Sequence, residues 1–303
     1  MNYDFTTYIW SLFAGWLICI FFFYFLLSKK IHSEKRYFFI CFVFVLCPLF
    51  GLICSKLFYV LFRINIFFHG NAILSDLFNI KLEELSFSGA TAGVILGIFV
   101  SAKAVGLSSR QTLNIFAPVG ALMIAIARIN EMHLGMLGVG MYLENGFFPF
   151  AQPIYWGNLI EWYFAVFTLE AFFAIIISIF AFIHRNESYC FIRTLFYLCL
   201  SQIFCESLRT NTISWLFVKA EQVLCFAICE GTLIWFAFKT DYKNIHNWVS
   251  AITGIFVLLL IIAVEFALDK TDISHLISYI FMLLGLVIMA YVECKNYRFL
   301  KCN

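Results

Sequence analysis

The sequence has 303 residues, of which 63% are hydrophobic and 13% are charged, and its formal net charge is +2. An average soluble domain has about 45–50% apolar and about 25% charged residues. A soluble fold of this length could not bury so much apolar surface, so the composition excludes a water-soluble globule and indicates a membrane protein. The small net charge gives no indication of nucleic-acid binding.

Nine segments are long and apolar enough to cross a bilayer as helices, because a hydrocarbon core of about 30 Å needs about 20 apolar residues. The predicted spans are residues 8–28, 38–62, 87–106, 111–128, 161–184, 191–208, 215–238, 247–268 and 274–293. The fourth contains Pro118 and the sixth ends in polar residues, so both are expected to lie among other helices. The predicted fold class is an all-α polytopic membrane protein.

Lysine and arginine are unevenly distributed over the segments that connect these spans. The connections after spans one, three, five and seven, together with the C-terminal tail, hold most of the 20 basic residues. Because cytoplasmic segments carry the positive excess, the pattern places the N-terminus outside and the C-terminus in the cytoplasm.

Two predicted outer connections are unusually long, residues 63–86 and residues 129–160. Loops of this length are usually functional or disordered. The second is rich in glycine and aromatic residues, and so many aromatics argue against disorder. It is predicted to lie at the outer headgroup level, where Trp and Tyr are favoured.

Ionisable residues within or at the ends of the spans mark candidate sites, because a charge at a helix centre costs about 2.5–3.5 kcal/mol. They are Lys56, Arg128, Glu131, Glu161, Glu170, Glu206, Arg209, Glu221, Glu230 and Glu265. Arg128 with Glu131, and Glu206 with Arg209, have i,i+3 spacing at the outer ends of spans four and six. Each pair is interpreted either as charge neutralisation at a helix end or as part of one pocket for a phosphate, which an arginine fork suits.

Three further patterns have mainly structural interpretations. The 11 cysteines form no CxxC pair and no Cys/His cluster, so neither a zinc site nor a disulfide framework is predicted. Gly89, Gly93 and Gly97 recur every fourth residue, which predicts close packing of helices. Lys56, deep in span two, is interpreted as a buried cation paired with a helix carboxylate.

Short motifs follow one another along residues 8–238 in a characteristic order. They are SKLFYVLF at 55–62, SFSGA at 86–90, AVGLS at 104–108, ARINE at 127–131, EWY at 161–163, ESLR at 206–209 and Gln222. In this order the chain resembles the prolipoprotein diacylglyceryl transferase family. The resemblance is carried by the succession of motifs rather than by any one of them.

The resemblance implies a seven-helix core over residues 1–238, with a two-helix transmembrane extension over residues 239–303. It implies a place in the bacterial plasma membrane. The activity implied is transfer of the diacylglyceryl group of phosphatidylglycerol to the lipobox cysteine thiol of preprolipoproteins. Its partners would be phosphatidylglycerol, a lipoprotein precursor and the membrane, without nucleic acid, cofactor or metal.

The resemblance also implies roles for individual residues. Arg128 matches the arginine that binds the phosphatidylglycerol head, and Glu206 and Arg209 match charged residues that shape the same pocket. Two positions depart from the family: Ser88 replaces a histidine and Gln202 replaces an arginine. Besides Arg128, the residues expected to bind substrate are Ser88, Gly89, Gln202 and Tyr59.

The reaction needs a thiolate and a group that holds the charge of the departing phosphate. Arg128 and Arg209 suit the second task. Glu131 is the first candidate for the base, followed by Glu206 and His133, although a plain salt bridge between Glu131 and Arg128 is an equal interpretation. The field of the two arginines could also lower the pKa of the substrate thiol without a dedicated base.

Two other functions stay open at this stage. An inactive relative that binds phospholipid or lipoprotein precursor fits the loss of the family histidine and arginine. A small-molecule transporter fits the hydrophobicity, but the sequence has no internal repeat and no matched pair of broken helices.

Overall fold

A computed structural model describes residues 4–63, 81, 84–156, 159–210, 214–215, 218–239, 244–270 and 274–302. Within these residues nine helices are long and apolar enough to cross a membrane, which confirms the predicted number of spans and an all-α multi-pass membrane protein. The chain divides into two compact units. The N-terminal unit contains Thr6–Ala127 and Ile175–Phe191, and the C-terminal unit contains Met1–Phe5, Arg128–Ala174 and Ile192–Asn303.

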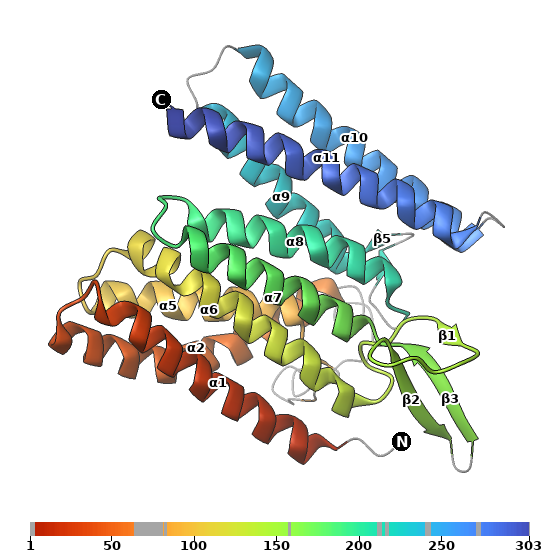
Figure 1. The fold of residues 1–303 in the computed structure, drawn as a ribbon, viewed down its shortest axis with the longest axis horizontal. Coiled ribbons are helices and arrows are strands. Elements are labelled where there is room, and N and C mark those ends of the chain that lie inside the picture. The colour runs from red at the N-terminus through yellow and green to blue at the C-terminus, as the bar shows by residue number, and fades with distance from the viewer. Residues whose placement is uncertain are drawn as a thin grey trace. The chain divides into compact units, whose positions relative to one another are not determined.

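The spanning helices run in colour from red to blue in Figure 1. They are α1 (Phe5–Ser28), α2 (Ser33–Phe62), α5 (Phe87–Ala104), α6 (Ser109–Asn130), α7 (Val166–His184), α8 (Cys190–Leu208), α9 (Ala220–Lys239), α10 (Asn244–Lys270) and α11 (His275–Cys302). Many large apolar side chains on them are exposed, such as Phe21 at 75% and Ile183 at 67%. Outward-facing apolar residues of this kind require lipid around them.

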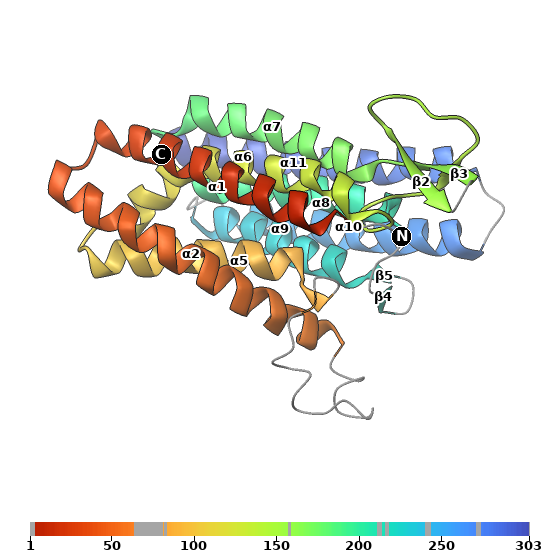
Figure 2. The same ribbon diagram turned by 90° about the horizontal axis from the view of Figure 1, so that it is seen from below.

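In the N-terminal unit, α2 and α5 pack closely side by side (Figure 2). A Cβ atom on Gly89 would lie 2.5 Å from the carbonyl oxygen of Cys54, and one on Gly97 would lie 2.9 Å from the Cα of Cys47. On Gly93 it would overlap the backbone of Phe50. The three glycines therefore let the two backbones touch, which confirms the predicted small-residue packing.

Lys56 is buried on α2 and its Nζ lies 2.5 Å from the Oε2 of Glu84. The prediction of a structural cation paired with a carboxylate is thus confirmed. The partner, however, belongs to the connection that precedes α5 and not to one of the long helices. The same connection supplies Ser86, whose Oγ accepts a hydrogen bond from the Gly89 amide and caps α5.

In the C-terminal unit, α8, α9, α10 and α11 share one apolar core, which includes Phe196, Leu233, Ile261 and Met289. Polar side chains are also buried between these helices: the amide of Asn296 on α11 donates a hydrogen bond to the hydroxyl of Ser250 on α10. The division into a core over 1–238 and an extension over 239–303 stays a prediction. The packing shows that the last two helices complete the core on which α8 and α9 rest.

The predicted fifth span is wrong at its start. Residues 161–165 are not helical, because β3 (Leu159–Phe164) precedes α7 and pairs with β1 (Tyr142–Leu143) and β2 (Ala151–Trp156) in an antiparallel sheet (Figure 1). The sequence signal is the aromatic and β-branched composition of residues 154–156 and 159–164, which is typical of strands. A second pair, β4 (Ser214–Trp215) and β5 (Val218–Lys219), likewise occupies the predicted start of the seventh span.

Candidate functional site

Charged residues of the C-terminal unit come together at one place, near the ends of α6 and α8 and the start of α7. Arg128 lies in the last turn of α6, and Glu131 opens the short 3₁₀ helix η2 (Glu131–Leu134) that follows it. Glu170 lies near the start of α7, and Arg209 directly follows α8. We call Arg128, Glu131, Glu170 and Arg209 the arginine cluster.

The carboxylate of Glu131 bridges the two arginines. Its Oε1 accepts a hydrogen bond from Nη1 of Arg128, and its Oε2 lies 2.8 Å from Nη2 of Arg209. One anionic group with two oxygens therefore joins two guanidinium groups from different helices. Such charge-assisted contacts are stronger than neutral hydrogen bonds and fix the relative position of the two arginines.

Glu170 is the second carboxylate shared by both arginines. Arg209 grips it with two bonds, from Nη2 to Oε2 at 2.5 Å and from Nε to Oε1 at 3.2 Å. Nε of Arg128 lies 2.8 Å from the same Oε2, an ion-pair contact without the angle of a hydrogen bond. Two positive and two negative groups thus neutralise one another, which is what a site of such low exposure requires.

Gln202 extends the arginine cluster along α8. Its Oε1 accepts from Nη2 of Arg128 at 3.2 Å, and its Nε2 donates to Oε2 of Glu206 at 3.2 Å. Glu206 is buried and its Oε2 lies 3.8 Å from Nε of Arg209. The neutral amide therefore links an arginine to a carboxylate without adding a third positive charge.

Lys219 closes the C-terminal end of α8. Its Nζ donates to the carbonyl oxygens of Glu206 and Arg209 at 2.5 Å each and to that of Ser207 at 3.2 Å. A cation at this end satisfies unpaired carbonyls and complements the helix dipole. Burial lowers the pKa of Lys219, while the carboxylates of Glu265 and Glu206 oppose that shift. The lysine thereby fixes the backbone from which Arg209 projects.

A glycine loop lies against the bridging carboxylate. Gly138 has φ of +86°, and a Cβ atom there would collide with Oε2 of Glu131. Gly140 approaches the carbonyl oxygen of Leu208, where a Cβ would lie at 2.5 Å. Glycine is required at the first position both for the left-handed backbone and for the close approach to Glu131.

Arg128 is only 2% exposed, although it carries a full charge. Burial alone would lower the pKa of Arg209, but the carboxylates of Glu131, Glu170 and Glu206 raise that pKa well above its ordinary value. Arg209 therefore stays charged, and the guanidinium of Arg128 does so as well because arginine is not deprotonated in proteins. An anion that entered here would meet two fixed guanidinium groups in a place of low dielectric constant, where electrostatic interactions are strong.

The structure brings five of the predicted site residues together: Arg128, Glu131, Gln202, Glu206 and Arg209. The other three belong to the N-terminal unit and are described there. Ser88 and Gly89 open α5, and Tyr59 is buried on α2 beneath the Nζ of Lys56, 5.7 Å from the ring centroid. The third candidate base, His133, lies half-buried on η2, where its carbonyl oxygen accepts from the amide of Asp4.

Sequence reasoning assigned no site role to Glu170 or Lys219. Glu170 stood among the ionisable residues at membrane depth, and that cost of burial was the signal that could have selected it. Lys219 had no comparable signal, because its role depends on backbone carbonyls that only the fold brings near. Gln222 was noted on a motif, and its Nε2 donates to Ile203 and to Glu265 of α10.

Comparison with known proteins adds no family to this geometry. No protein-family model matches the chain, and no curated protein matches it. The functional argument therefore depends on the residues described above.

Proposed function

We propose that this chain transfers the diacylglyceryl group of phosphatidylglycerol to the cysteine thiol of a lipoprotein precursor. The observation that carries the proposal is the convergence of Arg128 and Arg209 on the same carboxylates. The order of sequence motifs supports the same reaction. In the predicted orientation the arginine cluster lies toward the outer side of a bacterial plasma membrane, with the C-terminus in the cytoplasm.

Glu131 indicates how the phosphate would bind. Its two oxygens each take one arginine, which is the arrangement that the two non-bridging oxygens of a phosphodiester can adopt. Carboxylate and phosphodiester both carry one negative charge, so after the exchange the two arginines still face the same number of anionic partners. The lipid phosphate would thus replace Glu131 between the two guanidinium groups.

The transfer step forms one bond and breaks one. The thiolate sulfur attacks the diacylglycerol carbon that carries the phosphate, and the bond from that carbon to the phosphate oxygen breaks. The electron pair leaves with glycerol phosphate, whose second negative charge Arg128 and Arg209 would stabilise. Since they are held in place before the reaction, little reorganisation is needed.

The same exchange would supply the base. A carboxylate bound to two arginines is a poor proton acceptor. Once the lipid phosphate takes the arginines, Glu131 is released and can accept the thiol proton beside the reacting carbon. Glu206, which Gln202 contacts, is the alternative base.

A second function is a relative that binds the lipid or the precursor without transferring the group. The observation that favours it is the saturation of the arginine cluster, in which two carboxylates already satisfy both arginines. In that case Glu131 would keep its partners when lipid is present, and no base would be released.

The experiment that tests the proposal is lipidation of a lipobox peptide by the purified chain with phosphatidylglycerol as donor. We expect a peptide heavier by one diacylglyceryl group, with loss of the product in Arg128→Gln. Phosphatidylglycerol binding without product would instead establish the binding relative. Absence of both binding and product would overturn both functions.

A cellular assay gives an independent measurement. The chain is expressed in bacteria depleted of their own transferase, and precursor maturation is followed by gel shift. Lys103→Gln is the matched control, because it also removes one cation from a helix but lies in the N-terminal unit. Maturation by this variant and not by Arg128→Gln would support the proposal.

A further inference from the structure

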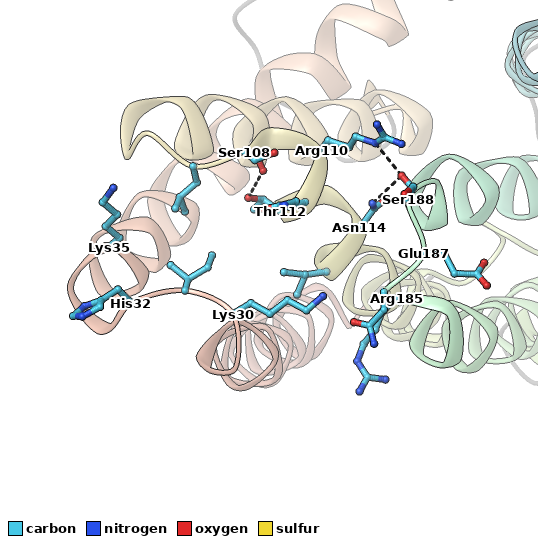
Figure 3. A pocket seen from close by; sticks show the side chains of 15 residues that line it. Lys30, His32, Lys35, Ser108, Arg110, Thr112, Asn114, Arg185, Glu187 and Ser188 are labelled. Carbon is cyan, nitrogen blue, oxygen red and sulfur yellow. Dashed lines mark hydrogen bonds between the residues drawn. The ribbon is translucent and has the colours of Figure 1, made fainter. Parts of the chain in front are cut away.

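The N-terminal unit contains a pocket of about 760 Å³ where α1 ends and α2 begins, where α5 ends and α6 begins, and in the loop after α7 (Figure 3). Ligand sites commonly have volumes of about 300–1,000 Å³. Three inter-helix segments, far apart in the sequence, thus surround one space that can hold a small molecule or a lipid headgroup.

The charges around this pocket are strongly unequal. Four side chains of Lys and Arg and one histidine line it, against the single carboxylate of Glu187; the basic residues are Lys30, His32, Lys35, Arg110 and Arg185. Lys30 and Lys35 are exposed and form no ion pair within the described part of the chain. In the arginine cluster every cation has a carboxylate, so this pocket differs in having positive charge to spare.

One wall of the pocket is held rigidly. Nδ2 of Asn114 and Nε of Arg110 both donate to the carbonyl oxygen of Ser188 at 3.0 Å (Figure 3). Oδ1 of Asn114 accepts from the amide of Phe191, and the guanidinium of Arg110 lies 4.4 Å from the ring centroid of Tyr189. Buried Asn114 thus fixes the loop after α7 to α6, and Arg110 is positioned before any ligand arrives.

We propose that this pocket binds a phosphate-bearing anion. The favourable features are its volume, its excess of positive charge, and the fixed guanidinium of Arg110, whose terminal nitrogens suit phosphate oxygens. α6 begins at Ser109 beside the pocket, and the N-terminus of a helix adds a favourable field for an anion. The site is separate from the proposed transferase chemistry and does not depend on it.

The phosphate can come from two sources. Basic pockets between membrane helices bind anionic lipid headgroups on the cytoplasmic side, the side on which the predicted orientation places this end of the helices. A soluble phosphate from the cytoplasm has the same chemistry. The two differ in whether acyl chains are needed for binding.

The test uses the full-length chain in nanodiscs of phosphatidylcholine. In the lipid arm, a small fraction of phosphatidic acid is added and the bound molecules are counted by native mass spectrometry. In the soluble arm, inorganic phosphate is titrated by calorimetry. Neither readout requires transferase activity, so failure of the proposed function leaves this test intact.

Two double variants separate a defined pocket from the general positive charge at this end. Lys30→Gln with Lys35→Gln removes two lining charges, and we expect affinity to fall by roughly thirtyfold, from the contribution of two cations near a phosphate surface. Lys29→Gln with Lys103→Gln removes two exposed charges outside the lining, and we expect a change of at most about threefold.

Loss in the lipid arm alone identifies a headgroup site, and loss in the soluble arm identifies a site for free phosphate. Equal loss in both double variants would overturn the proposal, because general charge would then explain the binding. Absence of saturable binding in both arms would overturn it as well.

Discussion

Two buried groups of arginine and glutamate lie along α8, and their difference separates a structural contact from a candidate site. At the first turn, Nε of Arg193 donates to Glu293 of α11 at 2.8 Å, and the hydroxyl of Tyr197 donates to the same carboxylate at 2.6 Å. The guanidinium carbon of Arg193 lies 3.9 Å from the ring centroid of Tyr297. Here one arginine meets one carboxylate, and aromatic groups surround them.

Beyond the last turn of α8, the arginine cluster is arranged differently. Glu131 and Glu170 are each shared by two arginines, so each carboxylate could be exchanged for another anion while the remaining one keeps the arginines together. The ion pair of Arg193 described above is with a single carboxylate, that of Glu293. We therefore interpret carboxylates shared by two arginines as a sign of a place where a ligand can enter. The Arg193–Glu293 pair is instead interpreted as a structural contact between α8 and α11.

The largest effect on stability is expected from breaking the Arg193–Glu293 pair. Glu293→Gln leaves Arg193 charged and buried, which should lower the free energy of unfolding by about 3–5 kcal/mol. Thermal unfolding in nonionic detergent measures this loss. Arg193→Met with Glu293→Met removes both charges and should recover most of the stability. Failure of the double variant to recover stability would show that the Arg193–Glu293 pair is more than a structural contact between two helices.

The next effect concerns the shape of the cation at the two ends of α8. Arg209→Lys keeps the positive charge but loses the two hydrogen bonds that Arg209 donates to Glu170. Transfer of the diacylglyceryl group to a lipobox peptide should therefore fall by about 10²–10³-fold. Arg193→Lys makes the matched change at the other end. Its activity per folded molecule should stay near that of the unchanged protein, and equal losses in both variants would abolish the distinction between the two groups.

The sequence predicted most of the fold because span length and hydropathy follow directly from the thickness of a bilayer. One of its two interpretations of Arg128, Glu131, Glu206 and Arg209 placed them in one pocket, because charges at membrane depth are costly and these lie at matching helix ends. The start of the fifth span was wrong because an aromatic strand such as β3 has the same hydropathy as a helix. Periodicity over so short an apolar run does not separate the two.

Other contacts could not be predicted because they join residues distant in the sequence. Glu84 pairs with Lys56 across 28 positions, and Glu293 pairs with Arg193 across 100. The role of Lys219 depends on the carbonyls at the end of α8, which have no signature in the sequence. These pairings arise from packing, and a single sequence carries no record of which helices touch.

A smaller effect should come from the glycine beside Glu131. Gly138→Ala and Gly106→Ala both place a Cβ on a left-handed backbone, with φ of +86° and +69°, which costs about 1–2 kcal/mol in each case. Only the first also displaces the Glu131 carboxylate, since the space around Gly106 is open. Transfer per folded molecule should therefore fall by roughly 10²-fold in Gly138→Ala alone. Equal activity in the two variants would exclude an active role for Glu131.

The smallest effect on stability is expected at the Lys56–Glu84 pair. Among the described residues, its carboxylate is not shared by two arginines, and it is more exposed than the carboxylates that contact α8. The hydrogen bond from Lys56 lowers the pKa of Glu84, so the folded state binds a proton at Glu84 less readily than the unfolded state. The stabilisation is therefore complete above the unfolded pKa of about 4.3 and is lost as the pH falls through the lower pKa of the folded state.

Glu84→Gln should accordingly lower the free energy of unfolding by at most about 1 kcal/mol at pH 7, because the Glu84 side chain is 22% exposed and water can reach this end of the pair. The difference between this variant and the unchanged protein should shrink as the pH falls below about 4. Thermal midpoints in nonionic detergent over this range measure it. Lys81→Gln is the control, because it removes an exposed cation that lies 3.6 Å from Glu84 and leaves both Lys56 and Glu84 in place. A difference that persists in acid would show that Glu84 acts through packing rather than through its charge.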